Sequence, residues 1–163
     1  MKLSLRPLAI GLIVVAFSVL LLDRARAGGD HYFPPVTDAT VKAECGSCHL
    51  AFAPSMLPAR SWKRMMSDLG NHFGDDASVD AATASRITSY LVANAADSNG
   101  GRNSRKLMRG LAPESAPLRI TELPKWKSEH REVADWEWKQ KDVGTKANCA
   151  ACHVDAERGY YDD

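Results

Sequence analysis

All four cysteines of this 163-residue sequence fall into two motifs of the same form, CGSCH at residues 45–49 and CAACH at residues 149–153. Cys-x-x-Cys-His is the attachment signature of a c-type haem. Residues three apart share one face of a helical turn, so both thiols can add to the vinyl groups on one edge of the macrocycle. The histidine that follows can then bind the iron as an axial ligand. The sequence predicts two covalent haems, with thioether bonds and first axial ligands from Cys45, Cys48, His49, Cys149, Cys152 and His153.

Paired cysteines can also serve other purposes. Two structural disulfides would suit an exported chain, but they leave the histidine after each pair unexplained. A thioredoxin-like dithiol needs a βαβ context, and no Val/Ile-rich strand precedes either motif. Zinc accepts thiolate and imidazole together, so a zinc site built from Cys48, His49 and their counterparts is chemically possible. The duplicated motif and the use of every cysteine favour haem attachment.

Each haem iron needs a second axial ligand, and three histidines lie outside the motifs. After the first motif, the sequence predicts one amphipathic helix with Ser61 as its N-cap and Gly74 as its stop. Its apolar face consists of residues at spacings of three and four, namely Trp62, Met65, Met66, Leu69, His72 and Phe73. A histidine at the end of a helix can simply face water, but a macrocycle packs well against an apolar face. We therefore expect His72 to bind the first iron.

A second helix is expected from Ser78 or Asp80 to about Ala96. Its apolar face is formed by Ala84, Ile87, Tyr90, Leu91 and Ala95. This helix offers no ligand, so it should complete the wall of the first haem pocket. Residues 97–104 (DSNGGRNS) concentrate turn formers and mark a domain boundary.

The C-terminal part should be poor in regular structure, because Pro113, Pro117 and Pro124 interrupt any long helix. So short a segment needs an apolar centre from elsewhere, and the second haem can supply it. The side chains expected to pack on that haem are Leu118, Ile120, Leu123, Trp126, Trp136 and Trp138.

Two short helices are expected in this part. A helix capped by Thr121 would place Trp126, His130 and Val133 on one side, which makes His130 the expected second ligand of the second iron. A helix bracketed by a cap at Thr145 and by Gly159 would carry the second haem motif.

Other ligand assignments stay open at the level of sequence. His31 lies close to the start of the mature chain, where a histidine is typically a surface residue, but it could replace His72 or His130. Met108 follows the first motif at a separation similar to that of single-haem cytochromes with a methionine ligand. Met65 and Met66 fit the core better, because they belong to the apolar stripe of the first helix.

The spacing of the histidines hints that each half holds one ligand pair. His72 lies 23 residues after His49, and His130 lies 23 residues before His153. The order is reversed between the halves, so this is no direct repeat. Ligation that crosses between the halves is compatible with the same spacing.

The N-terminal segment has the order of a secretory signal peptide. Lys2 and Arg6 precede an apolar run at residues 8–22, and Ala25-Arg-Ala27 follows. A retained membrane anchor is the alternative, although this run is short for a span. Loss of residues 1–27 removes four of 21 basic and one of 20 acidic residues, which leaves a formal charge of −2. We expect a periplasmic protein with no membrane span after processing. We expect no nucleic-acid partner, because the sequence does not concentrate basic residues on one face.

These elements predict a mainly α, small two-domain protein. Residues 1–27 are the signal peptide, 28–98 an N-terminal helical haem domain, 99–118 a linker, and 119–163 a C-terminal haem domain poor in regular structure. The preferred function is a low-potential electron carrier and no enzyme, because three histidines beyond the motifs suffice to saturate both irons. The alternative is a small dihaem enzyme of the peroxidase or nitrogen-oxide reductase type, which needs one open haem site. A haem sensor would need an output domain that is not seen here.

The sequence resembles the dihaem cytochrome c family of purple bacteria and other proteobacteria. In the N-terminal half the resemblance rests on Glu44-CGSCHLAFAP, Leu57-PARSW and His72-FGDDA, and in the C-terminal half on Arg119-ITE, Trp126, His130-RE and Asn148-CAACHVDAERG. It covers residues 33–163, and no haem motif departs from the family pattern.

The resemblance implies a two-domain electron carrier with two bis-histidine haems. The matching ligand positions are His49 with His72 and His130 with His153. It also implies redox partners of two kinds, a small oxygen-binding monohaem cytochrome and a membrane cytochrome b.

Overall fold

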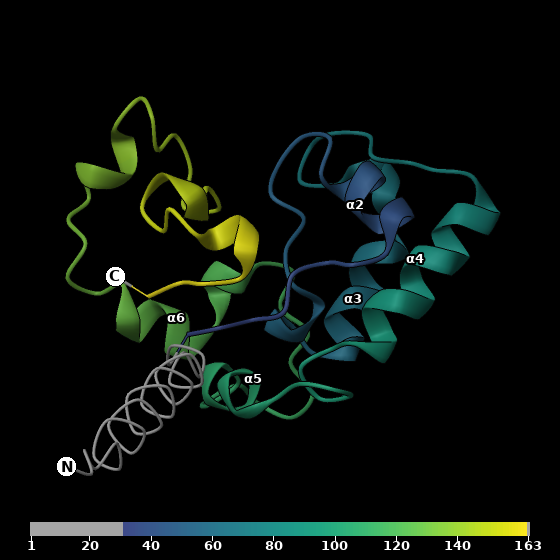
Figure 1. Ribbon diagram of the computed structural model, residues 1–163, viewed down its shortest axis with the longest axis horizontal. Helices are drawn as coiled ribbons and strands as arrows, with labels where there is room; N and C mark the ends of the chain where they lie inside the picture. Colours follow the sequence, from purple (N-terminus) through teal and green to yellow (C-terminus); the bar gives the residue numbers. More distant parts are fainter. Residues whose placement is uncertain (1–30, 163) are drawn as a thin grey trace, which may run out of the picture. The chain divides into compact units, whose positions relative to one another are not determined.

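The computed structural model in Figure 1 describes residues 31–162, which are mainly helical and contain no β-strand. The signal peptide expected at residues 1–27 lies outside this range. The α-helices are α2 (Ala39–Cys45), α3 (Ala59–Met66), α4 (Ala81–Ala93), α5 (Arg102–Leu107) and α6 (Pro124–Glu129). The 3-10 turns are η1 (Pro54–Met56), η2 (Leu69–Asn71), η3 (Ile120–Glu122), η4 (Glu137–Lys139), η5 (Cys149–Ala151) and η6 (Ala156–Arg158).

Helices α2 and α4 both begin at an aspartate cap. The Asp38 carboxylate accepts the backbone N–H groups of Thr40 and Val41, which have no partner inside the first turn of α2. Asp80, one of the two starts that the sequence allowed, caps α4 in the same way. Arg86 of α4 donates to Asp38 at 2.9 Å and holds the pKa of that carboxyl below its usual value. This ion pair links α4 to the start of α2, whose last residue is Cys45.

Helix α3 is shorter than expected and starts earlier. The sequence predicted a helix from Ser61 to Phe73, but α3 begins after Pro58 and ends at Met66. Ser61 is therefore no cap; it lies buried within the helix. The chain then makes the separate turn η2, because Ser67 and Asp68 favour turn geometry over the helix interior.

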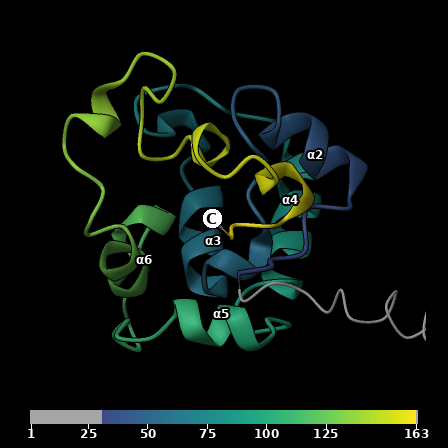
Figure 2. The ribbon, with the colours of Figure 1, turned by 60° about the vertical axis from the view of Figure 1, so that its left-hand side comes forward.

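The hydrophobic core lies mainly between α3 and α4, which pack side by side (Figures 1 and 2). Ile87 and Leu91 of α4 face inward as the helical spacing predicted. Trp62 of α3 is buried, and its indole N–H donates to the Pro54 carbonyl at 2.8 Å. The buried apolar cluster comprises Phe33, Val36, Val41, Ala53, Met56, Leu57, Trp62, Ile87, Leu91, Ala95, Leu107 and Leu123.

The segment expected to be a linker, residues 99–118, is more ordered than the sequence indicated. It contains α5, whose Leu107 belongs to the buried core. Two arginines of α3 hold the following loop: Arg60 donates to the Ser115 carbonyl at 2.6 Å and pairs with Asp97 at 3.3 Å, and Arg64 donates to the Ala116 carbonyl at 3.0 Å. This loop is thus fixed to α3 by charged donors.

Replacing Arg60 by Ala should lower the free energy of unfolding by about 1–3 kcal/mol, because the partly buried Ser115 carbonyl loses a charged donor. Urea unfolding monitored by circular dichroism measures this change. Arg131→Ala is the matched control, since Arg131 pairs with exposed Glu132 and donates to the Ser128 carbonyl. Its loss should cost less than about 1 kcal/mol. Equal effects of the two substitutions would contradict the anchoring role of Arg60.

After residue 118 the chain forms one six-residue helix and four 3-10 turns. Helix α6 begins at Pro124, a residue suited to the first helical position, and not after a Thr121 cap. The second motif lies in the short turn η5, followed by η6, instead of in one helix bracketed by Thr145 and Gly159. Gly159 does end η6 in the left-handed conformation (φ 88°) that favours glycine.

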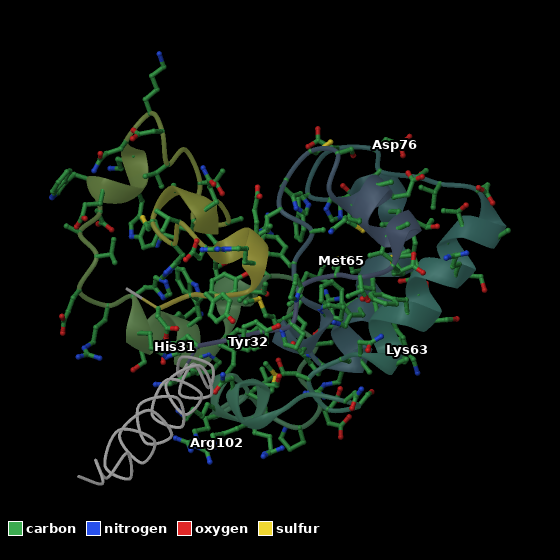
Figure 3. The ribbon with its side chains drawn as sticks, viewed as in Figure 1. His31, Tyr32, Lys63, Met65, Asp76 and Arg102 are labelled. Carbon is green, nitrogen blue, oxygen red and sulfur yellow. The ribbon has the colours of Figure 1, made fainter. Side chains whose placement is uncertain are left out.

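The start of the described chain pairs with its end. Phe33 N–H donates to the Gly159 carbonyl at 2.8 Å, and the rings of Tyr32 and Tyr160 lie 4.8 Å apart. His31 approaches the carboxylates of Glu129 in α6 and of Asp162; Figure 3 shows it beside α6.

Residues 31–162 form one compact unit. The division into two haem domains stays a prediction.

None of the helices within residues 31–162 combines the length and apolar character needed to cross a membrane.

Candidate functional site

No disulfide joins the cysteines of the two motifs, and in each pair one side chain is half-buried and the other exposed. Cys45 ends α2 and Cys149 opens η5, so each motif starts where a short helix meets a turn. Burial raises the pKa of Cys45, and it raises the pKa of Cys149 to about 11. In each motif the first cysteine is the more buried one and the second faces solvent. Both sulfur atoms are thus available to the edge of a haem that approaches from the solvent side.

The first motif places its histidine opposite His72. The imidazole rings of His49 and His72 lie 6.1 Å apart, centroid to centroid, with planes 17° from parallel. His49 is oriented by a 2.8 Å hydrogen bond between its Nδ1 and the Leu50 carbonyl. The ring of Phe52 stacks on it at 5.2 Å. Its Nε2 is left for a metal.

His72 occupies a tight turn and not the helix end that the sequence suggested. Its backbone N–H donates to the Asp75 carbonyl at 2.8 Å, and Asp75 N–H donates back at 3.2 Å. The two residues between them, Phe73 and Gly74, have φ of 58° and 107°. Positive φ at both central positions is the mark of a type I′ turn, which glycine accommodates at its second position. Burial lowers the pKa of His72, which favours the neutral imidazole that binds metals.

A residue far along the chain covers the turn that carries His72. The guanidinium of Arg119 lies 3.7 Å from the centre of the Phe73 ring, a cation–π contact. Beside it is a hollow of about 330 Å³, lined by His72, Phe73, Arg64, Arg119 and other side chains. Left-handed Phe73 is therefore stabilised by a contact that offsets its backbone strain.

The second motif places its histidine opposite His130. Their ring centroids lie 6.1 Å apart, as in the first pair, but the ring planes are 80° from parallel. His130 is the C-cap residue of α6, and its Nδ1 lies 2.9 Å from the Trp126 carbonyl. The Trp126 indole stacks on the imidazole at 4.1 Å and 15°, and Trp138 approaches the same ring at 6.1 Å.

His153 is positioned by the turn that carries the cysteines. Its backbone N–H donates to the Cys149 carbonyl at 2.9 Å, so the motif closes one helical turn. The Tyr161 ring meets the His153 ring edge-on at 5.7 Å. Burial raises the pKa of the Tyr161 hydroxyl, which keeps it neutral.

The two imidazole pairs fit bis-histidine haem irons. A metal binds imidazole nitrogen at about 2 Å, and the ring centre lies about 1 Å behind that nitrogen, so two imidazoles on one iron have centroids about 6 Å apart. Both pairs meet this distance, and each lies beside its own cysteine pair. The described residues contain no cluster of three His, Cys, Asp or Glu side chains suited to a bare metal ion.

The residues considered as alternative iron ligands have other contacts in the structure. His31 forms its contacts with Glu129 and Asp162, and Met108 is the C-cap of α5, packed against the core. Met65 and Met66 also pack against the core, as their spacing indicated. Trp136 differs from our expectation: its side chain is 66% exposed, whereas Trp126 and Trp138 gather at His130.

Sequence reasoning did not find Phe52, Tyr161 or the Arg119–Phe73 contact. Phe52 follows His49 by three residues, a spacing that could have suggested its stacking. Tyr161 lies eight residues after His153 and Arg119 lies 46 residues after Phe73, and neither separation is the three- or four-residue spacing of contacts within a helix.

The profile of the dihaem cytochrome c family matches residues 41–161. The chain belongs to the dihaem cytochrome c family. This dihaem cytochrome therefore carries two covalently attached haem c groups, at Cys45 with Cys48 and at Cys149 with Cys152. Membership also implies a role in electron transfer.

Solved structures of similar proteins support the family assignment. A diheme cytochrome c from Rhodobacter sphaeroides is 49% identical, with a TM-score of 0.70 over 77% of this chain and 98% of that one. A second structure from the same organism is 47% identical, with a TM-score of 0.64 over 77% and 97% of the two chains. A diheme cytochrome from Shewanella baltica is 35% identical, with a TM-score of 0.62 over 76% and 86%. Among curated proteins none matches.

Proposed function

We propose that this dihaem cytochrome is a periplasmic, low-potential electron carrier in which both irons have two histidine ligands. The observation that carries the proposal is the pair of opposed imidazoles at each cysteine motif, with the same 6.1 Å centroid separation. The ligands are His49 with His72, and His130 with His153. With two protein nitrogens on each iron, no coordination position is open to a substrate.

Haem iron supplies a one-electron couple between its ferric and ferrous states. The protein's part is to hold the imidazoles in the same place in both states, so that electron transfer requires little rearrangement. The carbonyls of Leu50 and Trp126 fix the Nδ1 atoms of His49 and His130. Imidazole in place of a methionine thioether lowers the reduction potential.

The location and the partners rest on the sequence. Residues 1–27 have the features of an export signal, and the remaining chain is weakly acidic. The partners are other redox proteins. By family resemblance they include a small oxygen-binding monohaem cytochrome and a membrane cytochrome b.

In the purified holoprotein, both oxidised haems should be low-spin, and the reduced protein should not bind carbon monoxide near neutral pH. Both potentials should lie below those of cytochromes with His/Met ligation. Optical titration with carbon monoxide and spectroelectrochemistry measure these properties. Rapid carbon monoxide binding at one haem, with turnover of hydrogen peroxide, would instead support the enzyme alternative. A haem whose reduction potential lies in the range of His/Met cytochromes would indicate that Met108 is a ligand.

A further inference from the structure

The two imidazole pairs have the same separation but a different relative rotation. The ring planes are 17° apart for His49 and His72, and 80° apart for His130 and His153. An imidazole on a metal can turn about the metal–nitrogen bond, so its orientation is set by the groups around it. The difference must therefore arise from the neighbours of each ring.

One residue contacts His130 in two ways. The Trp126 indole lies parallel to the imidazole, at 4.1 Å and 15°, and the Trp126 carbonyl lies 2.9 Å from Nδ1. The carbonyl fixes the direction in which Nδ1 points, and the flat indole face fixes the plane of the ring. Trp138 packs against Trp126 at 5.8 Å and limits its movement.

The partner ring, His153, is held by a different part of the chain. Its turn starts at Cys149, and its ring meets Tyr161 at 62°. The right angle between the rings therefore depends on two separate contacts, and Trp126 sets the plane on the His130 side. In the first pair, His49 stacks on Phe52 at 26° and no ring of the described residues stacks on His72 as closely as Trp126 does on His130.

We propose that Trp126 is a positioning residue that holds the His130 imidazole perpendicular to that of His153, which makes the second haem electronically different from the first. This inference rests on the ligand pairs of the proposed function. Each imidazole donates π-electron density to the iron d orbital perpendicular to its plane. Two iron d orbitals can accept this density. Parallel rings raise the energy of the same one of the two and separate their energies strongly, whereas perpendicular rings each raise one of them and leave the two energies nearly equal.

The expected electron paramagnetic resonance spectrum of the oxidised holoprotein contains two low-spin signals. The first haem gives a rhombic signal, and the second gives a nearly axial signal with a larger maximum g value. Trp126→Leu removes the indole but keeps the backbone carbonyl. The maximum g value of the second signal should then fall, while the rhombic signal stays unchanged and both haems remain low-spin.

Trp126→Phe keeps a smaller ring and should shift the same signal in the same direction by less; it decides the question if the Leu variant does not fold. Trp136→Leu is the matched control, because Trp136 is 66% exposed and should affect neither signal. An unchanged second signal in both Trp126 variants overturns the inference, and so does a wild-type spectrum with two rhombic signals. Failure of the ligand assignment is distinguishable, because His130→Ala would then leave both haems low-spin.

Discussion

Replacing His130 by Ala should convert one of the two haems from low-spin to high-spin and make it reactive with carbon monoxide. His130 faces His153 at 6.1 Å, whereas His31 contacts Glu129 and Asp162 and Met108 packs against the core. Without the imidazole, the iron keeps only its ligand from the CAACH motif and offers an open position. Optical spectra of the oxidised protein, and carbon monoxide titration of the reduced protein, measure the change. The reactive fraction should be half of the haem.

His72→Ala should have the same effect on the other haem, and the double variant should open both. The control is His31→Ala, which removes a histidine whose charged contacts are with Glu129 and Asp162. Its spectrum should match that of the wild type. A fully low-spin His130→Ala protein, together with a high-spin His31→Ala protein, would show that the N-terminal segment supplies the ligand.

Replacing Cys45 and Cys48 by Ala should reduce the covalent haem from two groups per chain to one. The remaining haem should stay attached through Cys149 and Cys152 after acid–acetone extraction, because no thioether bond can form at the altered motif. Mass spectrometry of the extracted protein gives the haem count directly. The matched variant with Cys149 and Cys152 replaced should retain the first haem only.

The same pair of variants tests the division into two haem domains. If residues 28–98 and 119–163 fold separately, loss of one haem should leave the spectrum of the other unchanged. Loss of both haems from either variant would show that the two parts fold together. The contacts through which such coupling would act join the two parts directly: the hydrogen bond from Phe33 to the Gly159 carbonyl and the contact of Arg119 with the Phe73 ring.

Local chemistry explains what the sequence could predict. The two motifs, the Asp80 cap and the buried face of α4 all depend on neighbours within four residues, and each is confirmed. The first predicted helix was too long, because the helical spacing of its apolar face continues through Leu69, His72 and Phe73 although the helix ends at Met66. Ser67 and Asp68 stop α3, and Gly74 serves a type I′ turn instead of a helix end.

The C-terminal part was harder to predict for a different reason. The spacing of Trp126 and His130 indicated their shared side, but the contact of Trp138 with Trp126 and the pairing with residues 31–33 leave no periodic pattern. The prolines correctly indicated short elements. They could not show that Pro124 would start α6, a position that suits its fixed φ.

The pairing of residues 31–33 with residues 159–161 has a consequence for the order of folding. Phe33 can find its partner only after nearly the whole chain has been synthesised, so this contact closes last and carries a large loop-closure entropy. A Cβ at Gly159 would collide with the Phe33 carbonyl, and the residue also has a positive φ. The pairing of residues 31–33 with residues 159–161 therefore depends on this one glycine. Gly159 lies only six residues after His153, so substituting it would loosen the chain directly behind the second haem motif.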